Sequence, residues 1–188
     1  GGGNDILSGA GASVAMKVDG GAGADIISTG AAKDTVSGGG GGDTLRGGGA
    51  NDVLRGKSGA DRIFGEAGND KIFGDNGADR LDGGAGKDTI KGGGSADFLL
   101  GGSSHDTLSG GNGSDHLKGG SGDDTLDGGE GNDRLSGGSG GDTLTGGKGG
   151  DEFVLAQTSK VDVITDFETG TDMILLDSAH MAGLDARA

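Results

Sequence analysis

Aspartate recurs at a fixed interval along most of the chain, and its carboxylate is the side chain best suited to chemistry here. Steps of nine residues give Asp25, Asp34, Asp43, Asp52, Asp61, Asp70, Asp79, Asp88, Asp97, Asp106, Asp115, Asp124, Asp133, Asp142 and Asp151. Spaced carboxylates can bind metal ions or act as pairs of general acid and base. The strict period is better explained by metal ligands than by acid–base catalysis.

The nine-residue unit predicts the elements that position these carboxylates. If Asp is sixth, position eight is apolar in all fifteen units, and position one is glycine in all but one, where Thr29 stands. Positions seven to nine place one inward apolar side chain between two outward ones, as a strand requires. With a six-residue turn after each strand, two strands and two turns make a coil of 18 residues. Alternate aspartates of the series then stack in two rows.

Stacked carboxylates predict a bound cation. Rows with a spacing of about 4.8 Å between strands place like charges next to one another, and these charges repel. A divalent cation between successive turns removes that repulsion. Calcium accepts six to eight oxygen ligands in flexible geometry, including the backbone carbonyls of glycine-rich turns. Calcium therefore fits this ligand set better than magnesium or zinc.

Composition limits the other classes of protein. The 188 residues include 50 Gly, no Pro and no Cys, with a formal net charge of −15. Lack of cysteine excludes disulfides, thiol nucleophiles and thiolate zinc sites, and the acidic charge disfavours nucleic acid as a partner. No apolar run approaches the roughly 18 residues of a membrane span. Collagen is excluded by the lack of proline and of a Gly-X-Y triplet, and the constant register favours an ordered repeat over a disordered linker.

Individual units match a known calcium-binding nonapeptide, G-G-x-G-x-D-x-U-x, where U is apolar. Examples are Gly119–Asp127 and Gly128–Ser136. From Gly20 to Val154 the chain resembles the RTX (repeats-in-toxin) family of proteins exported by Gram-negative bacteria. The resemblance implies an all-β fold, a right-handed parallel β-roll of 18-residue coils.

The same resemblance implies the ligands of each ion. One turn supplies its Asp and the carbonyls of positions two and four, and the turn 18 residues on supplies its Asp and the carbonyls of positions one and three. Two sites of this kind would use the carbonyls of Gly111, Gly113, Gly128 and Glu130, and of Gly120, Gly122, Gly137 and Ser139. The gaps within the two rows predict about 13 interior calcium sites. We expect weaker sites where position four is not glycine, at Ala32, Ala50, Ser95 and Ser104.

The ends of the chain depart from the repeat. We expect degenerate repeats at residues 1–19, with Met16 at an Asp position, then the β-roll at 20–154, capping strands at 155–177 and a tail at 178–188. The apolar stretches Val161–Phe167 and Met173–Leu176, joined by a turn at Gly170, predict two strands that cover the open edge of the last coil. This C-terminal β cap resembles the caps of serralysin-type proteases and alginate epimerases.

The predicted function follows from a small core and many ion sites. One inward apolar residue in nine is too few to order so much glycine, so calcium must drive folding and the metal-free chain should be disordered. The family implies a secreted, extracellular or cell-surface protein of a Gram-negative bacterium, which leaves by type I secretion and folds in extracellular calcium. Alternatives are a segment of an adhesin or surface-layer protein, or an accessory module that binds an acidic polysaccharide such as alginate beside a catalytic domain.

The polysaccharide alternative depends on the outward strand positions. One predicted sheet face is net basic, with Arg46, Arg62, Arg80, Lys118 and Arg134 against Asp82 and Glu152. Solubilising surface charge explains the same pattern. We expect no enzyme activity in this fragment, because His105, His116 and His180 show neither a metalloprotease spacing nor partners for a nucleophile.

Overall fold

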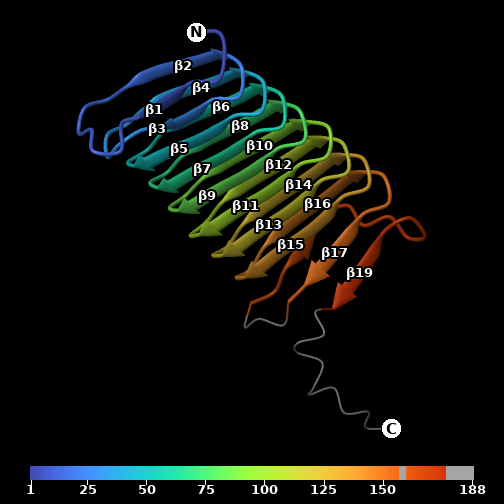
Figure 1. Cartoon of the computed structure of the whole chain (residues 1–188). Helices are drawn as coiled ribbons and strands as arrows, with labels where there is room; N and C mark the ends of the chain where they lie inside the picture. The colour runs from blue at the N-terminus through green and yellow to red at the C-terminus, as the bar shows by residue number, and fades with distance from the viewer. Residues whose placement is uncertain (157–159, 177–188) are drawn as a thin grey trace, which may run out of the picture.

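Two parallel sheets form the opposite walls of a solenoid in the computed structural model, which describes residues 1–156 and 160–176 (Figure 1). The 10-stranded sheet has the order β1-β3-β5-β7-β9-β11-β13-β15-β17-β19, and the 9-stranded sheet the order β18-β16-β14-β12-β10-β8-β6-β4-β2. The strands are β1 (Ile6–Ser8), β2 (Lys17–Ala22), β3 (Ile26–Ser28), β4 (Thr35–Gly40), β5 (Thr44–Gly49), β6 (Val53–Ser58), β7 (Arg62–Ala67), β8 (Lys71–Asn76), β9 (Arg80–Ala85), β10 (Thr89–Gly94), β11 (Phe98–Ser103), β12 (Thr107–Asn112), β13 (His116–Ser121), β14 (Thr125–Glu130), β15 (Arg134–Ser139), β16 (Thr143–Lys148), β17 (Glu152–Leu155), β18 (Val163–Ile164) and β19 (Met173–Leu176).

The register of both sheets confirms the predicted 18-residue coil. Leu117 on β13 pairs with Leu135 on β15, and Leu108 on β12 pairs with Leu126 on β14, in parallel orientation. Successive strands therefore alternate between the walls. The fold is the all-β parallel β-roll that the repeat predicted, and no helix occurs among the residues whose structure is described.

The strands are longer than the repeat suggested. We expected three-residue strands and six-residue turns, but a typical strand such as β13 includes positions seven to nine and continues through positions one to three of the next unit. The pairing of β13 with β15 skips Gly119 at position one and resumes at Gly120. The chain bends at this glycine beside the Asp side chain and then returns to the ladder. Only positions four to six form the turn.

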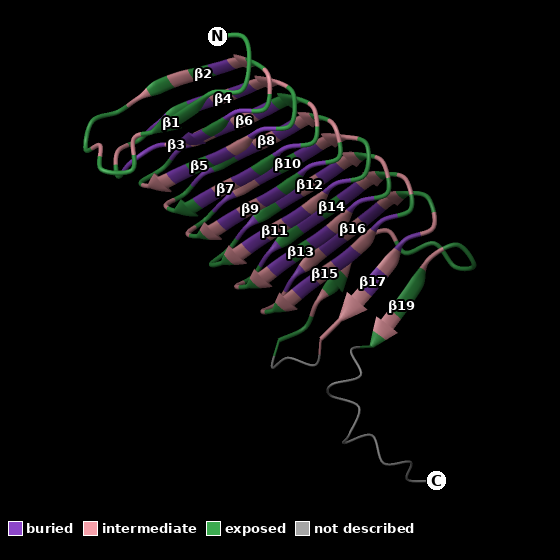
Figure 2. Cartoon of the chain, in the orientation of Figure 1, coloured by how far each residue is buried: buried purple, intermediate pink, exposed green. Residues whose placement is uncertain are grey.

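The core is one apolar residue wide. The fifteen position-eight residues, from Ile27 to Phe153, are at most 2% exposed and stack between the two walls. Figure 2 shows this buried column running through the strands, with exposed residues at the turns and at both ends. So thin a core leaves the turns to be stabilised by other interactions.

Positions two and four of the repeat unit have left-handed backbone conformations. Positive φ angles occur at both positions in fourteen of the fifteen units. Six of these residues are not glycine, namely Ala50, Lys57, Glu66, Asp75, Ser95 and Ser104. The exception is the turn of residues 29–34, where neither Gly30 nor Ala32 has a positive φ. Three of the four turns with a non-glycine at position four thus keep the common geometry, and the turn of Ala32 does not.

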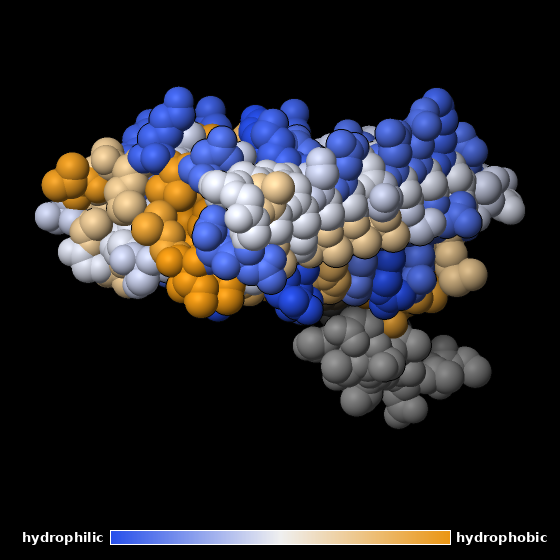
Figure 3. Space-filling model, turned by 45° about the horizontal axis from the view of Figure 1, so that its top comes forward, coloured by the Kyte–Doolittle hydropathy of each residue, from blue (hydrophilic) through white to orange (hydrophobic). Residues whose placement is uncertain are grey.

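The N-terminal end of the roll is less regular. The N–H of Met16 donates to Asp34 Oδ1 at 2.6 Å, so Met16 occupies the Asp position of its turn as predicted. Ile6 and Val14 are exposed. Figure 3 shows apolar side chains, in orange, gathered at the end that holds the first strands, whereas hydrophilic residues follow the edges of the later coils.

The C-terminal end adds one strand to each sheet. β18 pairs with β16 and β19 pairs with β17, both in parallel. Within the expected strand 161–167 only Val163–Ile164 pairs, because Asp162 and Asp166 on either side turn their carboxylates onto N–H groups of the last coil. The expected tail at 178–188 lies outside the described residues.

Candidate metal centres

Each aspartate of the series holds its row together through one carboxylate oxygen. The N–H of Asp97 donates to Asp115 Oδ1 at 2.7 Å, and the N–H of Asp115 donates to Asp133 Oδ1 at 2.7 Å. The same bond links aspartates 18 residues apart along both rows. All fifteen side chains are buried, with at most 4% exposed. The structure therefore brings the predicted site residues together in the two predicted rows.

The second oxygen of these carboxylates has no hydrogen-bond partner among the described residues. This holds for Oδ2 of fourteen of the fifteen aspartates, all except Asp34. Buried polar oxygens are normally hydrogen-bonded, and an unpaired buried charge is costly. Fourteen such atoms in register are the expected sign of a cation that is part of the folded protein, so the residues fit calcium.

Glycine at position one keeps space open beside each unpaired oxygen. A Cβ on Gly110 would overlap Asp115 Oδ2 and would lie 2.7 Å from the carbonyl oxygen of Gly128, 18 residues on. The carboxylate of one turn and the position-one carbonyl of the next thus approach the same small space. Gly128 belongs to the predicted ligand set, and Gly137 has the same relation to Gly119 and Asp124 in the other row.

The remaining predicted carbonyls also lie between successive turns. A Cβ on Gly129 would overlap the carbonyl oxygen of Gly111, and one on Gly131 would overlap that of Gly113, so both carbonyls point toward the next coil. The same holds for Gly120 and Gly122 in the other row. The position-three carbonyls of Glu130 and Ser139 accept N–H bonds from Gly113 and Gly122 at 2.8 Å. A carbonyl oxygen has a second lone pair, so such a bond leaves room for a metal ligand.

Burial makes the metal-free carboxylates hold their protons more tightly. It raises the pKa of Asp61, Asp88 and Asp97 to about 7, and neighbouring aspartates of the same row raise it further, while the backbone N–H bond lowers it. Burial likewise raises the pKa of four others to about 6, namely Asp52, Asp106, Asp133 and Asp142. Near neutral pH, folding without metal would therefore require protons or unfavourable buried charge in the rows.

A comparison with profiles of protein families identifies the family of these repeats. The family profile described as RTX calcium-binding nonapeptide repeat (4 copies) matches residues 17–45, 46–81, 73–108, 82–117, 100–135, 109–144 and 118–153. The chain belongs to the RTX calcium-binding nonapeptide repeat family. The RTX repeats make it a calcium-binding module, and its two rows of buried carboxylate oxygens without hydrogen-bond partners fit such ions. None of the curated proteins compared with the chain matches it.

Other candidate groups in the described part of the RTX chain do not form a centre of their own. No cluster of three or more His, Cys, Asp or Glu side chains there is arranged to hold a metal ion, as expected if each site pairs two carboxylates with backbone carbonyls. His105 Nδ1 accepts the N–H of Asp123 at 2.7 Å, and His116 packs edge-on against Phe98. His180 lies outside the described residues. No helix in the described ranges could cross a membrane.

Sequence reasoning missed that both rows continue beyond Asp151. The N–H of Asp142 donates to Asp162 Oδ1 at 3.0 Å, and the N–H of Asp151 donates to Asp172 Oδ1 at 2.9 Å. Asp166 accepts the N–H groups of Gly146 and Gly147. The spacing here grows from 18 to 20 and 21 residues, so a search for a strict period passes over these side chains. They extend the rows into the C-terminal strands.

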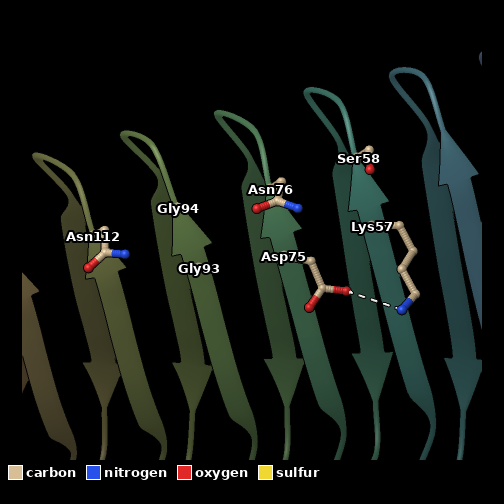
Figure 4. A pocket seen from close by; sticks show the side chains of 7 residues that line it. All are labelled: Lys57, Ser58, Asp75, Asn76, Gly93, Gly94 and Asn112. Atoms are coloured by element: carbon tan, nitrogen blue, oxygen red, sulfur yellow. Dashed lines mark ion pairs between the residues drawn. The ribbon is translucent and has the colours of Figure 1, made fainter.

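The three charged residues at position two, where glycine is usual, form surface ion pairs. Arg46 contacts Glu66 at 3.1 Å, and Arg55 and Lys57 contact Asp75 at 3.2 and 3.9 Å. Figure 4 shows Lys57 and Asp75 in an open groove of about 490 Å³, where Asn76 and Asn112 lie on either side of the bare backbone of Gly93 and Gly94. Each of these three side chains is thus paired with an opposite charge on a neighbouring strand of the same sheet.

Proposed function

We propose that this RTX module folds when it binds extracellular calcium, stabilises the protein to which it belongs and assists its secretion. The observation that supports this most directly is the register of fourteen buried, unpartnered Oδ2 atoms. Without cations these oxygens lose their water and gain nothing in return. With cations the same atoms become ligands, and the binding free energy becomes folding free energy.

The cellular setting follows from that dependence. A chain that stays unfolded in low intracellular calcium can pass through a type I secretion channel, and it then folds in the calcium-rich medium outside a Gram-negative cell. About 13 interior sites follow from the gaps in the two rows. The segment after residue 154 resembles the caps of serralysin-type proteases and alginate epimerases, and such a parent protein is compatible with this role. The alternative, that the module is a segment of an adhesin or surface-layer protein, is compatible with it too.

A calcium titration of chelator-treated protein, followed by circular dichroism, tests the folding role. We expect a cooperative change from disordered chain to β structure with calcium and none with the same concentration of magnesium. Asp115→Asn should raise the calcium concentration at the midpoint, because it weakens a ligand. Asp127→Asn is the matched control, since Asp127 lies on the neighbouring strand β14 and is exposed. A full β spectrum in chelator would contradict the proposal.

A second candidate function is the binding of an acidic polysaccharide along the 10-stranded sheet. The supporting observation is that Arg62 and Arg80 lie opposite each other on β7 and β9 and form no ion pair with any residue that the structure describes. The Arg80 guanidinium lies over the Phe98 ring, 4.6 Å from its centroid. Neighbouring strands are about 4.8 Å apart, so a linear polyanion along the roll would meet these two cations on successive strands.

Retention on immobilised alginate at fixed calcium tests this second function. Arg62→Ser together with Arg80→Ser should reduce retention. Lys71→Ser together with Lys91→Ser is the matched control, because it removes two charges from the adjacent strands β8 and β10 of the opposite sheet. Equal retention of wild type and the arginine variant would rule out this face as the binding surface.

A further inference from the structure

The turn of residues 29–34 is built differently from every other repeat turn. Thr29 replaces glycine at position one and is only 3% exposed. Its hydroxyl donates to the carbonyl oxygen of Gly47 at 2.7 Å. Gly47 is the position-one residue of the next turn in the same row, and its carbonyl is one that the RTX scheme assigns to an ion.

The carboxylate of this turn is also fully occupied. Asp34 Oδ1 accepts the N–H of Met16 at 2.6 Å, and Asp34 Oδ2 accepts the N–H of Gly30 at 3.3 Å. Asp34 is therefore absent from the set of aspartates with an unpartnered Oδ2. At other turns the second carboxylate oxygen and the position-one carbonyl of the next turn approach each other. Here Asp34 Oδ2 and the Gly47 carbonyl both accept hydrogen bonds from within the protein.

The backbone explains how these bonds arise. Gly30 and Ala32 lack the positive φ angles of the other turns, and this brings the Gly30 N–H onto its own Asp. In the regular turns a Cβ at position one would overlap the Asp Oδ2, as at Gly38 and Asp43. Thr29 places a side chain where that space would be, and its hydroxyl acts as the donor.

We propose that the gap between Asp34 and Asp52 takes no calcium, because the Thr29 hydroxyl and the Gly30 N–H make the contacts that an ion makes elsewhere. This inference rests on the proposed calcium binding and changes its count and position. In the row of Asp34 the first ion then lies between Asp52 and Asp70, where Asp52 Oδ2 has no partner and the Gly65 carbonyl lies near the Gly47 backbone.

Native mass spectrometry in saturating calcium tests the proposal, because it counts bound ions one by one. Asp34→Asn should leave the number of ions unchanged. Asp43→Asn is the matched control from the adjacent turn of the other row, where Oδ2 has no partner, and it should lose at least one ion. Loss of an ion from Asp34→Asn, with the roll still folded by circular dichroism, would overturn the proposal.

A gain-of-site variant gives an independent readout. Thr29→Gly combined with Ala32→Gly restores the repeat pattern and should bind one ion more than wild type, whereas Ala50→Gly, at a turn that already has the common geometry, should bind the same number. No gain in the double variant would count against Thr29 as the excluding residue. A wild-type protein that binds no calcium at all would instead overturn the proposed function, and this inference with it.

Discussion

The turns around Asp115 and the turn that ends at Asp34 show two ways of closing the same coil. At Asp115, Oδ2 is buried without a donor and faces the carbonyl of Gly128 across the space left by a glycine. At Asp34, an N–H and a threonine hydroxyl occupy the equivalent oxygens. The strand ladder after each turn is regular, but β3, which enters the turn of Asp34, pairs with β5 only from Ile26 to Ser28, whereas regular strands such as β13 also pair through positions two and three. The two regions thus differ in the oxygens of their turns, which supports the proposal that calcium is needed where these oxygens lack donors.

The largest expected effect is the pH dependence of the metal-free protein. Burial raises the pKa of Asp61, Asp88 and Asp97 to about 7 in the folded chain, above the ordinary value for aspartate in an unfolded one. At pH values between the unfolded and the folded pKa, the folded state thus binds more protons than the unfolded state. Its stability is greatest below the unfolded pKa and is lost as the pH rises toward 7. In chelator, circular dichroism should show more β structure at pH 5 than at pH 8.

Two variants test whether the buried aspartates cause this effect. Asp97→Asn should reduce the difference between pH 5 and pH 8, because it removes one of the raised carboxyls. Asp127→Asn, at an exposed position of β14, is the control for the loss of one carboxylate. Light scattering at both pH values controls for association near the sequence pI of about 4.3. Equal β content at the two pH values would contradict the prediction.

Core truncation should have the next largest effect, and it should differ between the regular coils and the N-terminal end. Leu126→Ala removes a fully buried side chain from the core column and should cost roughly 2–5 kcal/mol in the free energy of unfolding. Leu7→Ala truncates a side chain that is 37% exposed and should cost less than half as much. Urea unfolding in saturating calcium measures both. Similar losses would mean that the first coil is as tightly packed as the rest.

Much of this architecture could be predicted from the sequence, because each repeat carries the same pattern of aspartate, apolar residue and glycine. Asp at every ninth position and an apolar residue two positions later predicted the coil, the rows and the fifteen core residues. The length of the strands could not be read in the same way, because positions one to three are glycine-rich and resemble a turn until they pair with the next coil.

The residues that escaped prediction are those that act outside the period. Asp162 and Asp172 join the rows at spacings of 20 and 21 residues, and only the three-dimensional path of the chain brings them into line. Thr29 was noted as an exception at position one, yet its hydrogen bond to the Gly47 carbonyl depends on a backbone conformation that differs from its neighbours. The sequence shows where a residue departs from the repeat, but only the folded structure shows which atoms that residue contacts.

Glycine at position one should be required only where it borders a site. Gly110→Ala places a methyl group against Asp115 Oδ2 and the Gly128 carbonyl, and we expect a loss of roughly 1–3 kcal/mol and a higher calcium midpoint. Gly40→Ala is the matched control, because a Cβ there has no neighbour within 4 Å and the residue has no positive φ. Calcium titrations followed by circular dichroism compare the two. A normal midpoint for Gly110→Ala would place the ion elsewhere.

The smallest expected effect concerns a strained backbone position that carries an exposed side chain. Glu66 has a φ of 73°, a conformation that costs most residues about 1–2 kcal/mol and glycine little. Its ion pair with Arg46 is exposed, and such pairs contribute between about 0 and 1 kcal/mol. Glu66→Gly should therefore stabilise the folded protein by up to about 1 kcal/mol, since relief of strain exceeds the lost pair and the added freedom of glycine in the unfolded chain.

Salt separates the two contributions at Glu66. High salt screens the Arg46 pair in the wild type, so the advantage of Glu66→Gly should increase with ionic strength. Glu66→Ala loses the pair but keeps the strained backbone, and it should be slightly less stable than wild type at low salt and equal to it at high salt. Urea unfolding at fixed calcium measures all three proteins. A glycine variant less stable than wild type at every salt concentration would show that the carboxylate of Glu66 contributes more than its surface ion pair, and thus that position two also takes part in closing the turn.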